Sequence, residues 1–580
     1  MWKNKKFYYL FLINFIYYIK RLKLKYIYLK EGEILKKLQG KNNSEELIKF
    51  GDLLDEDYIN DEIPIVLARQ GERYYELNSY IKENESFEFI RIDNREAMPT
   101  YIRTLQFIFI KAVLDIFKDA KVIIEHAIGF GIYGSIIKEK SLIEDDIELI
   151  KKRMKEIIKA NYRIEKHKIS RLEGIEIFKS YGMEDKVRLL EEFKSENISL
   201  YKIDDRYDYF YGTMAYSTGI LKYFDVAYYN DGFLLLYPNY KAPTKTIDFL
   251  PSPKLFNIFK ESQNWLNILE VSDVGALNKK ILKGEAEDLI RISEALHEKK
   301  IAQIADMIDD RKDARVILVA GPSSSGKTTF TKRLAVQLRV NGLMPIMISL
   351  DDYFIDRDKT PVGEDGNPDY EALTALDINL FNENIKAILR GEEACIPTYN
   401  FKTGTREWTN NNLKLPKNGV VIIEGIHGLN DELTREIEEK SKFKIYISAL
   451  TQLNLDNHNR ILTTDVRKIR RIVRDYLSRG YGCEQTLKMW PSIKRGEKKN
   501  IFVFQENADV MFNSNLVYEL CVLKNLAIKE LEKIEESSDV YHEAKRLKAF
   551  LNFFEDIDFS KVPENSILRE FIGGSCFYQY

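Results

Sequence analysis

Residues 316–330 read VILVAGPSSSGKTTF, a run of mostly β-branched and small apolar residues that ends in a turn of glycine and serine. The turn closes with Gly-Lys-Thr-Thr and satisfies the spacing G-x-x-x-x-G-K-[ST]. A strand before such a turn and a helix after it direct backbone N–H groups and the positive end of the helix dipole toward phosphate. The stretch therefore predicts a nucleotide site in an α/β domain.

The residues of this loop have distinct expected roles. Lys327 is expected to reach the β- and γ-phosphates, and the Thr328 hydroxyl is expected to ligate Mg²⁺. ATP and Mg²⁺ are accordingly the predicted cofactors. The nucleotide is expected to contact the whole loop, which comprises Gly321, Pro322, Ser323, Ser324, Ser325, Gly326, Lys327, Thr328 and Thr329.

After residue 315, apolar strands alternate with helices, which predicts a mainly parallel sheet covered by helices on both faces. Acidic residues stand where two of these strands end: Asp351 and Asp352 follow PIMISL, and Glu424 follows VVII. A parallel sheet binds its ligands at the carboxyl ends of its strands. One carboxylate there can hold Mg²⁺, and another can accept the proton of an attacking hydroxyl.

Residues 465–475, DVRKIRRIVRD, place arginines within one broad face of a helix. Arginines that close over a transferring phosphate would neutralise its charge and exclude water. The pattern predicts a lid, whose arginines are Arg467, Arg470, Arg471 and Arg474.

Together these motifs resemble the uridine kinase branch of the phosphoribulokinase/uridine kinase family, over about residues 315–515. The resemblance makes Asp351, in SLDDYF, the general base and places Glu424 at the metal-associated acid. It implies that Lys327, Arg467 and Arg471 assist catalysis. It also implies an acceptor site formed by Asp351, Glu371, Tyr399, Phe401, Arg467 and Gln485.

The sequence departs from the family in the expected base-binding stretch, PTYNFKTGTR at 397–406. Gly404 stands where many uridine–cytidine kinases have a histidine, and Asn400 replaces a common acid. The resemblance therefore implies phosphorylation of a nucleoside 5′-hydroxyl, with uridine as the first choice and cytidine or a broader set left open.

The front half resembles the N-terminal region of threonyl-tRNA synthetase, with a TGS-like unit followed by the synthetase's second additional domain. The stretches that carry this resemblance are 118–135 and YGTMAYSTG at 211–219. In the synthetase, editing uses paired histidines on a helix and a Cys/His pair. Here the matching helix has Arg103 and Phe107, the front half has no cysteine, and no H-x-x-x-H occurs. Metal-type editing therefore lacks its ligands.

The whole combination, with NSILREFIGGSCFY at 565–578, resembles bacterial nucleoside kinases that carry a synthetase-like extension. The expected fold is an α/β P-loop kinase domain preceded by α+β units. Five segments are predicted, namely an apolar and basic segment at 1–30, the TGS-like unit at 31–92, the second-additional-domain-like unit at 93–284, a linking helix at 285–310, and the kinase domain with a C-terminal helical tail at 311–580.

Composition narrows the remaining alternatives. The 580 residues include 88 Lys and Arg against 90 Asp and Glu, so no global field attracts RNA or an anionic membrane. Four scattered cysteines without a C-x-x-C motif favour a reducing cytoplasm. The apolar run FYYLFLINFIYY at 7–18 is too short to span a membrane and is expected to belong to the first domain.

The sequence thus predicts a cytoplasmic nucleoside kinase whose partner is its nucleoside substrate. One rival is a P-loop kinase of another small alcohol, such as a sugar phosphate. Another is an RNA-binding regulator with a nucleotide switch, in which residues 31–250 would bind tRNA. Contact with a membrane is not expected, and formation of a homo-oligomer is left open.

Overall fold

The computed structural model describes residues 47–71, 73–82, 86–363, 366 and 368–578. The predicted 1–30 segment, with its apolar run, and the beginning of the TGS-like unit lie outside the described residues. Within the described ranges, none of the helices combines the length and the apolarity that crossing a bilayer requires.

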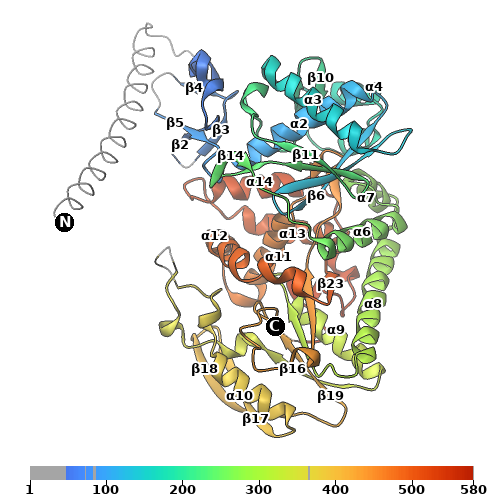
Figure 1. Cartoon of the computed structure of the whole chain (residues 1–580), viewed down its shortest axis with the longest axis vertical. Coiled ribbons are helices and arrows are strands. Elements are labelled where there is room, and N and C mark those ends of the chain that lie inside the picture. Colours follow the sequence, from blue (N-terminus) through green and yellow to red (C-terminus); the bar gives the residue numbers. More distant parts are fainter. Residues whose placement is uncertain (1–46, 72, 83–85, 364–365, 367, 579–580) are drawn as a thin grey trace, which may run out of the picture.

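A five-stranded sheet forms the centre of the C-terminal half, and every neighbouring pair of its strands is parallel (Figure 1). Its order is β16-β19-β15-β20-β23. Alternate residues of β15 enter two different cores, because Ile317 and Val319 pack on one side of the sheet while Val316 and Leu318 pack on the other. The strands are β15 (Val316–Ala320), β16 (Met344–Ser349), β19 (Gly419–Glu424), β20 (Lys442–Ser448) and β23 (Val510–Asn513).

Helices and two hairpins surround this sheet, so the predicted α/β class is confirmed. The helices are α9 (Lys327–Val340), α10 (Ile378–Leu389), α11 (Thr463–Arg474), α12 (Cys483–Asn500), α13 (Glu519–Leu531), α14 (Tyr541–Leu551) and α15 (Arg569–Ile572). The hairpins are β17 (Glu393–Asn400) with β18 (Thr405–Lys414), and β21 (Asn454–Asp456) with β22 (Asn459–Arg460).

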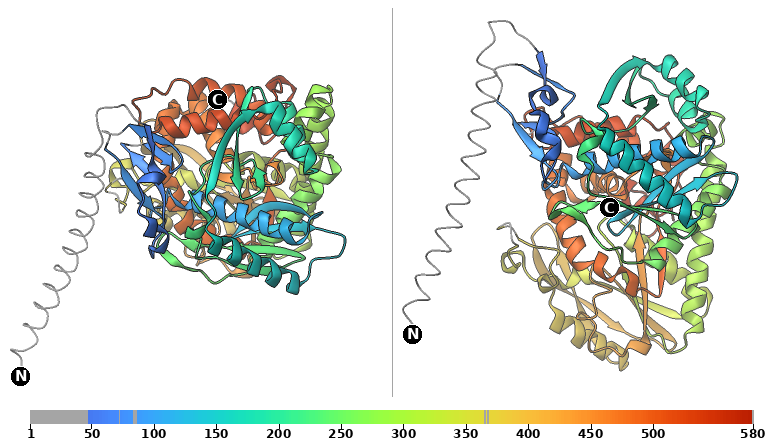
Figure 2. Two further views of the ribbon diagram at one scale, coloured as in Figure 1. Left: turned by 90° about the horizontal axis from the view of Figure 1, so that it is seen from above. Right: turned by 45° about the horizontal axis from the view of Figure 1, so that its top comes forward.

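The front half is α+β with antiparallel sheets, as expected. Its first part has sheets β1-β4 and β3-β2-β5, and it lies at the edge of the molecule beside the C-terminal helices (Figure 2). Its strands are β1 (Leu47–Lys49), β2 (Ile65–Gln70), β3 (Arg73–Glu76), β4 (Tyr80–Lys82) and β5 (Glu88–Arg91).

The second part of the front half has sheets β11-β12-β7-β6, β10-β9-β8 and β13-β14. Its strands are β6 (Lys121–Ile128), β7 (Gly131–Ile137), β8 (Ile164–Ser170), β9 (Asn197–Ile203), β10 (Arg206–Asp208), β11 (Asp225–Tyr229), β12 (Gly232–Leu236), β13 (Pro238–Asn239) and β14 (Ala242–Thr246). Its helices are α2 (Met98–Ile116), α3 (Glu144–Ala160), α4 (Arg171–Ser180) and α5 (Glu184–Glu191).

Three helices lead from the front half into the sheet: α6 (Pro253–Ile268), α7 (Val274–Leu282) and α8 (Ala286–Asp310). Helix α6 has proline at its first position, where the missing N–H costs nothing. One apolar core runs from α4, α5, α7 and α8 into β15, β20 and the C-terminal helices. The two halves therefore share a core, and we propose the five-segment division as a description of the chain rather than of separable bodies.

Candidate active site

The phosphate loop, residues 321–328, joins the central strand β15 to α9. Gly326 precedes the helix with φ of 84°, a left-handed conformation that glycine adopts without strain. Ser324 adopts φ of 59°, which costs a residue with a side chain of the order of 1–3 kcal/mol and is typical of functional loops. The Lys327 ammonium donates to the carbonyl oxygens of Gly321 and Pro322 over 3.1 and 3.2 Å. The loop is thus held with its lysine folded over its own backbone.

Glu424 lies beside this loop because β19 pairs with both β15 and β16. Its carboxylate oxygen Oε1 accepts hydrogen bonds from the Thr328 and Ser349 hydroxyls, each over 3.3 Å. Burial, with a further contribution from Asp351, raises the pKa of Glu424 to about 7, and Lys327 opposes the shift.

A threonine hydroxyl and one carboxylate fit Mg²⁺, which takes one or two protein oxygens, several waters and substrate phosphates. The described residues contain no group of three or more His, Cys, Asp or Glu side chains arranged to hold a metal. Any magnesium held here by Thr328 and Glu424 would therefore depend on the nucleotide for further ligands.

The two adjacent acids after β16 face different surroundings. Asp352 accepts a hydrogen bond from the Tyr399 N–H over 3.3 Å, and burial raises its pKa to about 6. Asp351 is partly exposed, and its charge contributes to the raised pKa of Glu424. Of the pair, Asp351 is therefore the carboxylate whose charge acts on Glu424, and its role as the general base stays a prediction.

Helix α11 brings three of its four arginines to the loop, and two of them contact Ser323. Arg467 donates from Nε to the Ser323 carbonyl oxygen over 2.9 Å, and Arg471 donates from Nη1 to the Ser323 hydroxyl over 2.7 Å. Arg467 also forms a buried ion pair with Glu497 of α12. Both guanidinium groups are therefore fixed beside the position that phosphates would occupy.

The other two arginines form ion pairs with carboxylates, although Arg470 also donates from Nη1 to the Ser324 carbonyl oxygen over 3.3 Å. Arg470 is fully buried and pairs with Glu519 over 2.6 Å, and Arg474 pairs with Asp475 over 2.8 Å. Helix α11 packs its apolar residues into the shared core, with Ile469 and Ile472 fully buried. The apolar contacts and the ion pairs with carboxylates therefore both hold α11 in place, and its closing over the nucleotide as a lid stays a prediction.

Sequence relationships agree with this geometry. Residues 316–517 match the model of the phosphoribulokinase/uridine kinase family. A uridine kinase from Anoxybacillus flavithermus is 31% identical over 185 residues, which cover 32% of this chain and 78% of that protein. The chain belongs to this family. A uridine kinase from Deinococcus deserti is 32% identical over 175 residues, which cover 30% of this chain and 75% of that protein.

The N-terminal region has a different relative. A threonine–tRNA ligase from Caldanaerobacter subterraneus is 34% identical over 148 residues, which cover 25% of this chain and 23% of the ligase. The chain thus spans about a quarter of the length of that ligase. Both resemblances stated from the sequence are confirmed, and the kinase family is joined here to a synthetase-like region.

Among the residues predicted for the acceptor site, Glu371 has a buried carboxylate oxygen with no hydrogen-bond partner among the described residues. Burial and the nearby charge of Glu497 raise its pKa to about 7, while Arg471 and Lys327 oppose the shift. A buried oxygen without a partner costs free energy, and a donor from a ligand would relieve that cost. This environment suits the predicted contact with a ribose hydroxyl.

The predicted aromatic pair lies next to Asp352. The Tyr399 and Phe401 rings are 5.1 Å apart and nearly perpendicular, and Phe354 packs 5.5 Å from Tyr399. Tyr399 is buried, whereas Phe401 is 46% exposed and has the Arg479 guanidinium 5.5 Å from its ring centre. Phe401 is thus the more exposed ring of the pair, and its contact with a nucleobase stays a prediction.

The structure explains why a glycine stands at position 404. Its φ is 75°, and a Cβ atom there would lie 2.7 Å from Nε of Arg357. Arg357 donates from its backbone N–H to the Gly404 carbonyl oxygen over 2.8 Å and from Nη2 to the Phe401 carbonyl oxygen over 2.6 Å. A side chain at residue 404 would therefore displace Arg357.

Gln485 is exposed in the first turn of α12 and remains a prediction for the acceptor site. Other residues were missed by sequence reasoning. Glu497 accepts a hydrogen bond from the Ser323 N–H over 3.0 Å, although 174 positions separate the two residues. Nothing local marks it, because it stands among the lysines and arginines of an amphipathic helix.

The C-terminal stretch also reaches the loop. Glu570 of α15 accepts hydrogen bonds from the Thr329 N–H over 3.0 Å and from the Thr329 hydroxyl over 3.1 Å. The Tyr578 and Thr329 hydroxyls are 2.8 Å apart. A carboxylate at the first turn of α9 is favourable for the helix dipole. The stretch that follows residue 565 therefore supports the back of the phosphate loop.

Proposed function

We propose that the chain transfers the γ-phosphoryl group of ATP to the 5′-hydroxyl of a nucleoside, with uridine as the preferred acceptor. The observation that carries this proposal is the convergence of Lys327, Thr328 and Glu424 at one loop, with Asp351 just after the end of β16, where its charge acts on Glu424. Family membership supports phosphoryl transfer, and the Phe401 ring with the partnerless Glu371 oxygen supports a ribose attached to a flat base.

In the proposed reaction the Asp351 carboxylate takes the proton of the 5′-hydroxyl as its oxygen forms a bond to the γ-phosphorus. The bond from the γ-phosphorus to the bridging oxygen breaks, and ADP leaves with that electron pair. Lys327, Arg467 and Arg471 and the loop N–H groups stabilise the charge that develops on the transferring group. Thr328 and Glu424 would hold magnesium, which would supply further positive charge to stabilise the transferring phosphoryl group.

The four cysteines, Cys395, Cys483, Cys521 and Cys576, are free. Free thiols fit a reducing compartment, and we place the protein in the cytoplasm on that basis. The alternative to this proposal is a different acceptor, because a sugar phosphate also has a hydroxyl that a general base can deprotonate. A panel of nucleosides and sugar phosphates, assayed by transfer of labelled phosphate from ATP, decides between them.

Two neighbouring substitutions test the role of Asp351. Asp351→Asn should abolish transfer, with an expected loss of at least about 100-fold because general base catalysis contributes of that order. Its dissociation constant for ATP should stay close to that of the wild type. Asp352→Asn is the matched control, because Asp352 is bound to the Tyr399 N–H, and it should keep most of the activity. Full activity in Asp351→Asn would refute the assignment.

A further inference from the structure

A cavity of about 620 Å³ lies outside the phosphate site, where three parts of the chain meet. Its wall includes Glu76 from the 47–92 unit, Arg103 and Tyr211 from the second part of the front half, and Arg546 of α14 from the C-terminal half. The volume falls within the range of small-molecule sites, roughly 300–1,000 Å³. None of the roles proposed above uses this cavity.

The charges around the cavity do not balance. Lys166 pairs with Glu76 over 2.9 Å, and Arg546 pairs with Asp465 over 2.7 Å and with Glu543 over 2.8 Å. Arg103 has no such carboxylate partner among the described residues, and its Nη1 donates to the Thr213 carbonyl oxygen over 2.6 Å. Burial lowers the pKa of Arg103, and Tyr201 and Glu76 partly offset that shift. One guanidinium charge in the cavity wall therefore has no carboxylate within ion-pair distance in the part of the chain that the structure describes.

The rest of the wall is rich in aromatic rings. Tyr75, Phe193, Tyr209 and Phe210 are among its residues, besides Tyr201 and Tyr211. Aromatic rings offer large apolar faces, and the Tyr hydroxyls can bind polar groups at the edge of a ligand. An anionic group at Arg103 with a flat body against these rings would satisfy both features.

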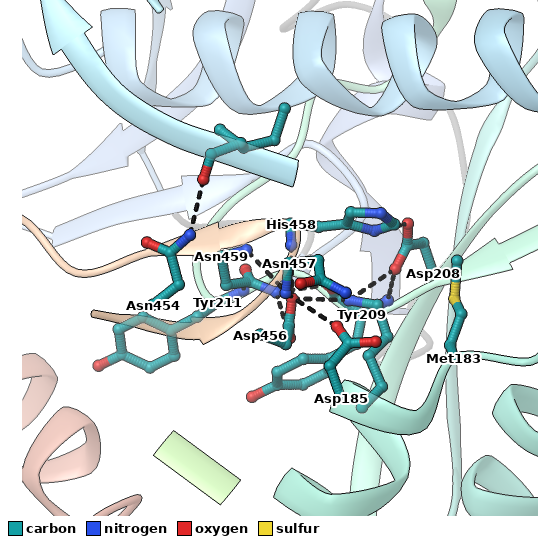
Figure 3. A network of polar contacts seen from close by, with 12 residues as sticks. Met183, Asp185, Asp208, Tyr209, Tyr211, Asn454, Asp456, Asn457, His458 and Asn459 are labelled. Atoms are coloured by element: carbon teal, nitrogen blue, oxygen red, sulfur yellow. Dashed lines mark hydrogen bonds and ion pairs between the residues drawn. The ribbon is translucent and has the colours of Figure 1, made fainter. Parts of the chain in front are cut away.

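The backbone of the aromatic wall is tied to a hairpin of the kinase domain. Asn459 of β22 donates from Nδ2 to the Tyr209 carbonyl oxygen and accepts from the Tyr211 N–H, both over 2.9 Å. The same hairpin is anchored in the front half by Lys186, which lies 3.0 Å from both Asp208 and Asp456. Figure 3 shows Asp208 of the front half beside His458 of this hairpin. The chain passes from β22 directly into α11.

A second connection joins the cavity to the same helix. Arg546, in the cavity wall, donates from both terminal nitrogens to the Asp465 carboxylate over 2.8 and 2.7 Å. Asp465 lies in the first turn of α11, whose Arg467 and Arg471 contact Ser323 of the phosphate loop. A movement of the cavity wall would therefore act on the arginines that contact the loop.

We propose that this cavity binds a small aromatic anion, with the anionic group on Arg103, and that its occupancy changes ATP affinity through α11. The anion is a phosphate or a carboxylate attached to a flat ring, as in a nucleoside monophosphate or an aromatic carboxylate. The second part of this proposal, the effect of the bound anion on ATP affinity, rests on the proposed ATP site. The first part, binding of the anion in the cavity, is independent of that site.

Binding is tested on the full chain by calorimetric titration with uridine 5′-monophosphate and, in a separate arm, with 4-hydroxybenzoate. At least one probe should bind saturably, and Arg103→Met should weaken that binding by about tenfold or more. Ser199→Trp, which fills the cavity from its wall, should do the same without touching Arg103. Arg291→Met removes an exposed arginine of α8 and should leave binding unchanged.

Uridine 5′-monophosphate is also the proposed product and can therefore bind at the active site. Only the binding that both Arg103→Met and Ser199→Trp remove is assigned to the cavity. Which of the two probes binds identifies the anionic group. 4-Hydroxybenzoate carries a carboxylate and has neither a ribose nor a phosphate, whereas uridine 5′-monophosphate carries both of the latter. Binding of neither probe, or binding that both cavity variants retain, would overturn the cavity site. This result would leave the proposed kinase activity untouched.

Transmission is measured as the dissociation constant for ATP with and without the bound probe. Coupled sites usually change each other's affinity by about fivefold or more. That change should be present in the wild type and lost in Asp465→Asn, which keeps the cavity but removes the charged link to Arg546. An ATP affinity that the probe leaves unchanged in the wild type would overturn the coupling, as would a change that Asp465→Asn retains in full.

Discussion

Arg467 and Glu497 form a buried ion pair directly behind Ser323 of the phosphate loop, and each also bonds the Ser323 backbone. Arg467 donates to the Ser323 carbonyl oxygen over 2.9 Å, and Glu497 accepts from the Ser323 N–H over 3.0 Å. Helices α11 and α12 are thus both joined to one residue of the loop. Since a loop that is positioned in advance binds phosphate with less ordering cost, these contacts contribute to nucleotide affinity.

Arg467→Met should weaken both folding and ATP binding. It leaves Glu497 buried and unpaired, and breaking such a pair typically costs about 3–5 kcal/mol. The free energy of unfolding from urea titration and the ATP dissociation constant from calorimetry measure the two effects.

The double variant Arg467→Met/Glu497→Leu separates them. Replacing both charges by apolar side chains removes the unpaired carboxylate, so stability should recover toward that of the wild type. ATP binding should remain weak, because no guanidinium contacts the loop from residue 467. Wild-type ATP affinity in the double variant would show that the arginine acts only on folding.

The raised pKa of Glu424, about 7, predicts a dependence of stability on pH. An unfolded glutamate titrates near 4.3, so the folded protein binds the extra proton between about pH 4.5 and 7. The contribution of Glu424 to stability is therefore fully present below that window and is lost as pH rises through 7. The free energy of unfolding of the wild type should fall relative to that of Glu424→Gln over this window.

Urea unfolding of both proteins at pH 5, 6, 7 and 8 gives this difference, and the subtraction removes the titration of other groups. Mg²⁺ with ATP should reverse the trend for the wild type, because a bound cation favours the ionised carboxylate. Parallel pH curves for the two proteins in the absence of ligand would contradict the shifted pKa.

The sequence was sufficient for the parts of the site that depend on local pattern. The strand before the phosphate loop, the helix after it and the acids Asp351 and Glu424 follow from apolar runs and their ends. The sequence was not sufficient for Glu497, Glu570 or Arg357, because their contacts with the loop or the acceptor side join distant parts of the chain. The spacing of arginines in α11 also did not reveal that Glu519 binds Arg470 and that Asp475 binds both Arg471 and Arg474.

Gly404→Ala should impair the acceptor site more than the ATP site. The left-handed backbone costs a residue with a Cβ roughly 1–2 kcal/mol, and the new atom would displace Arg357 from its contact with the Phe401 carbonyl. Loss of one such hydrogen bond is worth about 1 kcal/mol, or roughly a fivefold rise in KM for the nucleoside. Steady-state kinetics with ATP and uridine varied in turn measure both constants.

Gly391→Ala is the matched control, since Gly391 has φ of 80° and nothing within 4 Å of the new Cβ atom. It should lose similar stability from its backbone while leaving KM for the nucleoside unchanged. Equal values of KM in the two variants would mean that Arg357 does not shape the acceptor site.

Lys186→Met should destabilise the contact between the two halves of the chain. Although burial opposes it, Asp208 and Asp456 raise the pKa of Lys186, so the ammonium remains charged between two fully buried carboxylates. Its removal leaves both carboxylates without this cation, and we expect a loss of about 3–5 kcal/mol in the free energy of unfolding. The variant Lys179→Met removes an exposed lysine paired with Glu176 and should cost less than about 1 kcal/mol.

Because one core runs through both halves, Lys186→Met should still unfold in a single transition, which calorimetry would show. Two separate transitions in the wild type would refute this shared unit, and a loss no greater than that of Lys179→Met would refute the role of the buried triad.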